Sequence, residues 1–233
     1  HGVPPEQVAP FVVQARRNGV LNEYAHLRRS VRPEAVLRSP VAATPLRALD
    51  LPPRSVGAVA LVLATEAAVR RLARRAAWIE GIGWAVESYH LGSIDLASLP
   101  ALEAAARRAY QMAGVRRPGR DISAAEVHDL TSYHGLMACE ALGFARPGMG
   151  ARLFENGAAD INGRLPLNPS GGVLCTNLHS GSGLVRAAEA ALQVTGRAGR
   201  HQVRDARRVL AHGTSAISGA AAQSHCVVIL RRE

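Results

Sequence analysis

Two glycine-bearing loops carry the residue types best suited to bind an anion. The first is Asn168-Pro169-Ser170-Gly171-Gly172, and the second is His179-Ser180-Gly181-Ser182-Gly183, which runs into an amphipathic stretch beginning near Leu184. Glycines at a loop-to-helix junction let backbone N–H groups approach an anion, and the start of a helix adds the positive end of its dipole. A tight structural loop is the alternative interpretation. The residues predicted to contact an oxyanion or a phosphate are Asn168, Ser170, Gly171, Gly172 and Gly181.

Two further segments place histidines beside loops of this kind. His128 lies in Glu126-Val127-His128-Asp129, and His212 lies in Leu210-Ala211-His212-Gly213. Both segments have the pattern of a strand end, and open α/β sheets bind ligands at strand ends. We therefore expect three loops to converge on one site, with His179 in the third. For each imidazole the structural alternative is a histidine whose hydrogen bonds are satisfied by backbone.

The composition excludes several classes of chemistry. The chain has 28 basic and 18 acidic residues, and all 28 basic residues are arginine, so no lysine amine can form a Schiff base. The arginines are scattered without interleaved aromatics, which favours solvated helix faces over a nucleic-acid surface. No window reaches the ~18–20 apolar residues that span a bilayer. Three widely spaced cysteines indicate neither a metal site nor a disulfide framework, and hence predict a cytoplasmic protein.

The apolar pattern alternates between helix and strand periods, which predicts an α/β fold. Residues 56–64 are almost wholly apolar, as is typical of a strand buried on both faces. Residues 18–53 carry Asn-Gly and several prolines and predict an irregular excursion. The other predicted strands are 77–83, 124–127, 208–212 and 224–230, and the predicted helices are 4–17, 66–75, 99–113, 134–142 and 184–195.

Four motifs, taken in order along the chain, resemble the thiolase superfamily and within it the sterol-carrier or lipid-transfer type. The stretch RNGVLNEYAH at residues 17–26 is similar to the family's RNxxLNPYAH loop, and SVGAVALVLA at 55–64 is similar to its SDGAAALVLA strand. EVHD at 126–129 resembles EVHDCF, and LNPSGG at 167–172 resembles xNPSGG. The ordered set is more specific than any single motif.

The resemblance implies a thiolase-like fold built from two βαβαβαββ halves. Residues 76–233 would be a complete C-terminal half, and residues 1–75 the loop domain and end of the N-terminal half. The half that normally carries the nucleophilic cysteine has no counterpart here. Leu130 stands where the family has the cysteine of HDCF, residues 177–183 are shorter than its GHPxGATG loop and lack the proline, and residues 212–215 lack the cysteine of CxG.

These missing cysteines make the thiolase-like retro-aldolases of steroid side-chain degradation the better fit within the resemblance, since Claisen chemistry needs a thiolate. Such an enzyme cleaves a β-hydroxy acyl-CoA without a tightly bound cofactor and works with a small partner bearing an OB-fold and a zinc ribbon. A homodimer or hetero-oligomer is expected. The resemblance implies that His128 donates to the thioester oxygen. His179 and His212, in the two glycine-bearing loops, are candidates either to complete the oxyanion hole or to hold a tyrosine in place.

Two phenols could relay a proton to a developing alkoxide, namely Tyr133 and Tyr89, although buried tyrosines more often fill a core. Two other functions stay open at this stage. One is a non-catalytic subunit that binds acyl-CoA or lipid or acts as a scaffold in a thiolase-like complex. The other is a 3-ketoacyl-CoA thiolase whose nucleophilic cysteine lies outside this chain.

Overall fold

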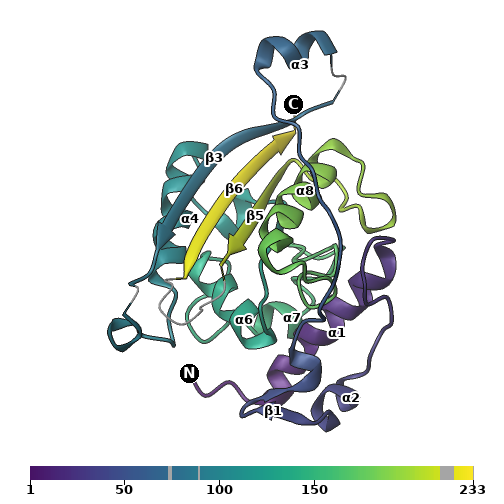
Figure 1. Cartoon of the computed structure of the whole chain (residues 1–233), viewed down its shortest axis with the longest axis vertical. Helices are drawn as coiled ribbons and strands as arrows, with labels where there is room; N and C mark the ends of the chain where they lie inside the picture. Colours follow the sequence, from purple (N-terminus) through teal and green to yellow (C-terminus); the bar gives the residue numbers. More distant parts are fainter. Residues whose placement is uncertain (73–74, 89, 216–222, 233) are drawn as a thin grey trace.

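A mixed four-stranded sheet forms the centre of the molecule (Figure 1). The computed structural model describes residues 1–72, 75–88, 90–215 and 223–232. Within them the strands lie in the order β3-β6-β5-β4, with β4 parallel to β5 and the other pairs antiparallel. Their bounds are β3 Ala77–Val86, β4 Ala124–Glu126, β5 Arg208–Thr214 and β6 Ser224–Arg232. A single parallel bridge from Ala125 to Leu167 extends the sheet beyond β4.

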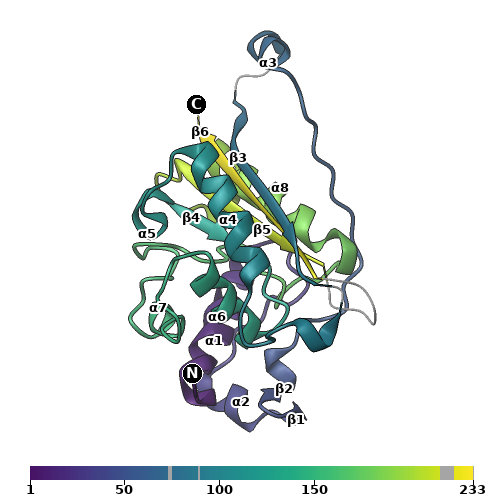
Figure 2. The same cartoon turned by 90° about the vertical axis from the view of Figure 1, so that its left-hand side faces the viewer.

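Helices cover the two faces of this sheet (Figures 1 and 2). Helix α4, Pro100–Ala113, packs on β3 and β6, and α8, Ser182–Thr195, packs on β5 from the other side. Helix α4 lies so close to β3 that a Cβ added at Gly83 would be 1.9 Å from the carbonyl oxygen of Ala105. The predicted α/β class is therefore confirmed.

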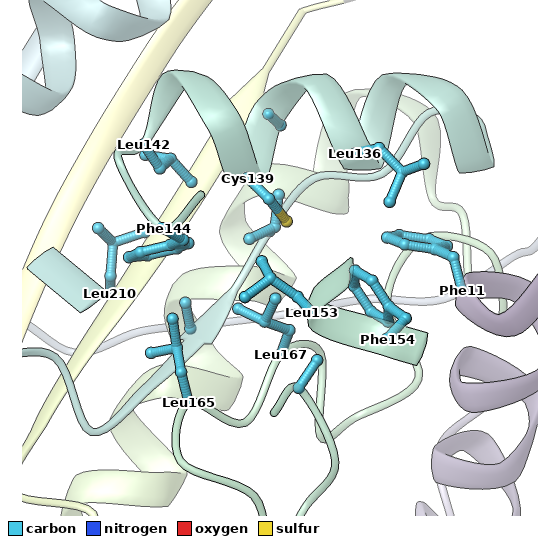
Figure 3. Packing of buried hydrophobic residues seen from close by; sticks show 14 of the residues in the cluster. Phe11, Leu136, Cys139, Leu142, Phe144, Leu153, Phe154, Leu165, Leu167 and Leu210 are labelled. Carbon is cyan, nitrogen blue, oxygen red and sulfur yellow. The ribbon is translucent and has the colours of Figure 1, made fainter. Parts of the chain in front are cut away.

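A hydrophobic core links the beginning of the chain to its later helices (Figure 3). Helix α1, Pro5–Leu21, brings Phe11 against Phe154 with ring centroids 4.6 Å apart, and Leu136 lies beside them. The remaining helices are α2 Pro33–Arg38, α3 Glu66–Leu72, α5 Pro118–Asp121, α6 Ser132–Ala141 and α7 Arg152–Glu155. This core includes residues from both predicted domains, whose boundary at residue 75 stays a prediction.

Helix α1 is longer than the sequence predicted, because tertiary contacts override Asn-Gly. The side-chain amide of Asn18 donates to the carbonyl of Asn168, and a Cβ on Gly19 would lie 2.7 Å from Sγ of Cys175. The predicted irregular region 18–53 also contains order of its own. It holds α2 and a small hairpin of β1, Val41–Ala43, and β2, Leu46–Arg47.

The predicted buried strand at residues 56–64 is wrong. The segment is an extended connection on the outside of the body that leads to α3 (Figures 1 and 2). Val62 is 94% exposed and Leu63 is 79% exposed. A strand needs a neighbour for its backbone groups, and no backbone group of 56–64 bonds to another residue that the structure describes. The apolar pattern was therefore right about the extended backbone and wrong about its burial.

Candidate functional site

A cavity of about 910 Å³ lies where the ends of β5 and β6 meet the loops before α8 and after β4. His128 and His179 both line this cavity, as the sequence predicted for converging loops. Trp84 of β3 and Leu184 of α8 supply apolar walls. The cavity therefore joins two predicted imidazoles to an apolar surface that could receive an acyl group.

The ring of His128 is buried and held by backbone. The N–H of Thr214 donates to its Nδ1 at 3.2 Å. A backbone N–H can only donate, so Nδ1 is an acceptor and a neutral ring must carry its proton on Nε2. Burial, with the positive charge of Arg186 adding to it, lowers the pKa of His128 to about 3. At neutral pH the ring is a neutral Nε2–H donor.

His179 has a different environment from His128. Its ring is exposed at the cavity, and its backbone has a positive φ of 51°. The Oδ1 of Asn177 stabilises that backbone by accepting from the N–H of His179 and from the hydroxyl of Ser182, both at 3.0 Å. The same Ser182 begins α8, two residues earlier than the sequence predicted. Asn177 thus joins the loop that carries His179 to the start of the helix.

The backbone N–H groups of the loop from Asn168 to Gly172 are bonded within the protein and are not free to bind a ligand. The N–H of Ser170 donates to Oε1 of Glu126, and that of Gly172 is 3.3 Å from the Ser170 hydroxyl. The N–H of Gly171 donates to Asn168, whose Oδ1 accepts from the backbone of Val127. These amides are already satisfied within the protein, so the geometry does not support the predicted anion contact.

Gly181, the fifth residue predicted to contact an anion, also has its N–H occupied, by the carbonyl of Leu178. Gly172 has a further constraint, since its φ is +70° and an added Cβ would lie 2.6 Å from both carboxylate oxygens of Asp129. Burial raises the pKa of Asp129 to about 7, although the backbone N–H groups of Val173 and Leu174 donate to its carboxylate and oppose that rise. The loop is thus fixed tightly beneath the His128 segment.

A buried ion pair locks this loop to α8. Arg186 is 1% exposed and Glu126 is not exposed, and Nη1 of the arginine lies 2.5 Å from Oε2 of the glutamate. The same Nη1 donates to the hydroxyl of Ser170 at 2.7 Å. Burial raises the pKa of Glu126, and the charge of Arg186 opposes that rise. Neither Glu126 nor Arg186 was predicted as part of the site, because no motif marks a pair separated by 60 residues.

Three sequence predictions for the site need correction or stay open. Tyr133 does not line the cavity of His128; it lines a neighbouring apolar cavity of about 540 Å³, and its hydroxyl has no partner among the described residues. His212 is fully buried behind the wall, where it contacts backbone and another ring instead of a ligand. Tyr89 lies outside the described residues. Leu130 lines both cavities and separates them.

Two residues of the wall were missed. His225 of β6 lines the cavity beside Cys226, which is exposed. Both follow a run of small residues in the sequence, and the register of β6 against β5 brings them to the site. Burial raises the pKa of the Cys226 thiol, whereas a nucleophilic cysteine needs a lowered one. The thiol therefore lacks the activation that acyl transfer requires.

Comparison with known proteins defines the family. Residues 83–232 match the family model described as "Thiolase C-terminal domain-like". Since this match covers more than half of the chain, the protein belongs to the thiolase C-terminal domain-like family. No described helix is long and apolar enough to cross a membrane.

Particular relatives give the extent of the similarity. An acetyl-CoA acetyltransferase of Methanothermobacter thermautotrophicus is 36% identical over 224 residues, which are 95% of this chain and 58% of that protein. Human sterol carrier protein 2 is 30% identical over 219 residues, covering 91% of this chain and 40% of that protein. The chain thus spans about three fifths or less of these curated relatives.

Solved structures agree on the fold. An Ltp2-ChsH2(DUF35) aldolase superposes with a TM-score of 0.82 at 24% identity, over 99% of this chain and 59% of that chain. A monomeric SCP2-thiolase like protein type 1 from Mycobacterium smegmatis gives a TM-score of 0.68 at 15% identity, over 97% and 46% of the two chains. The predicted resemblance to sterol-carrier-type thiolase-like proteins is confirmed.

Proposed function

We propose that this chain carries part of the active site of a thiolase-fold lyase that cleaves a carbon–carbon bond in a β-hydroxy acyl-CoA. The observation that carries the proposal is His128. Its ring is neutral, its Nδ1 is occupied by Thr214, and its remaining Nε2–H belongs to a cavity whose own thiol is not activated. Such a ring suits an oxygen that becomes negative, and it cannot serve as the base at neutral pH.

The reaction would be a retro-aldol cleavage. A base removes the proton of the β-hydroxyl, the carbonyl of a ketone or aldehyde forms at Cβ, and the bond between Cα and Cβ breaks. The electron pair of that bond moves into the thioester as an enolate, and a proton then adds to Cα to give the shortened acyl-CoA. The Nε2–H of His128 would stabilise the enolate oxygen. His179, exposed at the same cavity, is the candidate base and acid.

The acyl group would lie along the apolar wall of Trp84 and Leu184. A steroid side chain is the substrate that the family resemblance implies. The coenzyme would be substrate and not a resident cofactor, and the amides of the Asn168 loop would not bind its phosphates because they are occupied. We also propose a cytoplasmic location, which is the expectation from the cysteine content.

The proposal includes a partner. The aldolase neighbour is described as an assembly, Ltp2-ChsH2(DUF35), and the match covers 59% of that chain. In this chain, residues 56–64 are extended, apolar and without backbone partners among the described residues. We expect them to add as a strand to a sheet of a further domain or subunit within a homodimer or hetero-oligomer. A small protein with an OB-fold and a zinc ribbon is the second expected component.

Acyl transfer is the second candidate, favoured by the 36% identity to an acetyl-CoA acetyltransferase. It would require a cysteine from outside the chain or activation of Cys226. Binding of acyl-CoA without turnover is the third.

The test is to incubate the protein with a β-hydroxy acyl-CoA and to measure the released carbonyl compound and shortened acyl-CoA by mass spectrometry. We expect His128→Ala to lower the rate ~10²-fold or more, as for the loss of one oxyanion donor, and His90→Ala, outside the cavity, to leave it unchanged. An acylated Cys226 would favour the transferase, and binding without products would favour the third candidate. Equal rates for the two variants would refute the role of His128.

A further inference from the structure

Three buried imidazoles follow one another beside the cavity. They are His128 after β4, His212 in β5 and His225 in β6. The rings of His212 and His225 are stacked, with centroids 5.4 Å apart and an interplanar angle of 18°. Histidines from three separate segments are not required for filling a core, because apolar residues would do so without polar atoms to satisfy. The bonds among them are therefore informative.

The first bond decides where His212 carries its proton. The backbone N–H of His128 donates to Nδ1 of His212 at 3.3 Å. That nitrogen must be unprotonated, so the ring is neutral and its only proton is on Nε2. Its complete burial agrees with a neutral ring, because desolvation disfavours the charged form.

The second bond determines where His225 carries its proton. Nε2 of His212 lies 3.1 Å from Nδ1 of His225. Since His212 holds a proton on Nε2, it donates, and Nδ1 of His225 accepts. The neutral His225 ring must then carry its proton on Nε2. That nitrogen is itself buried and has no hydrogen-bond partner among the described residues.

We propose that His212 is a positioning residue that holds the backbone of His128 and fixes the buried ring of His225 in the Nε2–H tautomer. Two buried imidazoles then share one tautomer, which is set by two different backbone groups, Thr214 for His128 and His128 for His225. For His128, which lines the cavity, an oxygen of the acyl group is the ligand that an Nε2–H donor takes. This role in the reaction rests on the proposed function, whereas the arrangement of protons does not.

The arrangement can be tested on the protein without substrate. Long-range ¹H–¹⁵N spectra of histidine-labelled protein at pH 7 distinguish the two tautomers of each ring. We expect His128, His212 and His225 all to be Nε2–H, and a coupling through the hydrogen bond between the last two. A protonated Nδ1 on His212 or His225 would overturn the proposal, even if turnover of a β-hydroxy acyl-CoA were observed.

Two variants separate positioning from packing. His212→Asn keeps an acceptor near the position of Nδ1 and removes the donor to His225, so we expect His225 to become a mixture of tautomers. His128 is the internal control, because Thr214 still donates to its Nδ1. His225→Asn should leave the tautomer of His212 unchanged. An unchanged His225 spectrum in His212→Asn would refute the proposal, and the wild-type spectra decide it if the variant does not fold.

Discussion

Replacing Arg186 with methionine tests the buried ion pair that holds the Ser170 loop to α8. The substitution keeps a side chain of similar length but leaves the carboxylate of Glu126, which has no exposed surface, without its guanidinium partner. Breaking a buried pair in this way costs about 3–5 kcal/mol of unfolding free energy. For a domain of this size, that loss corresponds to a melting temperature lower by roughly 6–20 °C.

The pH dependence of that loss identifies its cause. Burial already raises the pKa of Glu126, and removal of the Arg186 charge raises it further. A carboxyl whose native pKa lies above its unfolded value gains stability as the pH falls from the native pKa towards the unfolded one near 4.5. The variant should therefore be less impaired at pH 5 than at pH 8, when both proteins are compared by urea unfolding at each pH.

Two controls make this prediction specific. Adding Glu126→Gln to Arg186→Met should recover most of the lost stability, because the uncompensated charge is removed. Arg197→Met, at an exposed position just beyond the same helix, should change the unfolding free energy by no more than about 0.5 kcal/mol. A loss below about 1 kcal/mol for Arg186→Met, or a loss that is equal at the two pH values, would refute the reasoning.

The remaining predictions concern the wall, the sheet and the exposed segment. Cys226 should react with a maleimide before the two buried cysteines, as peptide mapping would show, and reaction of all three at one rate would contradict the structure. Gly83→Ala should destabilise the protein by about 1–3 kcal/mol or more in urea, because the new Cβ meets the Ala105 carbonyl. The His128 ring should stay neutral in NMR titrations down to about pH 5, because its native pKa is about 3. This pKa lies below the unfolded value near 6.5, so the contribution of His128 to stability is lost as the pH falls from about 6.5 to about 3. Amides of residues 56–64 should exchange within seconds in the isolated chain, and slow exchange there would show a partner that the structure lacks.

Local patterns were enough to predict most of the fold. The helices around residues 99–113 and 184–195 and the strands after 77, 124, 208 and 224 have strong periodicity, and each was found within a few residues of its predicted bounds. The failures lie where long-range contacts decide the outcome. Asn18 extends α1 because it bonds to a loop 150 residues away, and 56–64 is exposed because no described strand lies beside it.

The site was predicted less completely, for a physical reason. Its chemistry depends on which nitrogen of a ring faces a backbone N–H, and that depends on segments far apart in the chain, such as Thr214 and His128. A motif can name His128, but it cannot show that His212 is behind the wall or that His225 follows it. Conversely, the glycine motif named the loop correctly but did not show that its amides are occupied, because the carboxylate that binds the Ser170 N–H is 44 residues away. In this family member, the glycines give the loop its shape, and Glu126, Asn168 and the Ser170 hydroxyl occupy its N–H donors. The imidazole N–H of His128 is then the donor for a substrate oxygen.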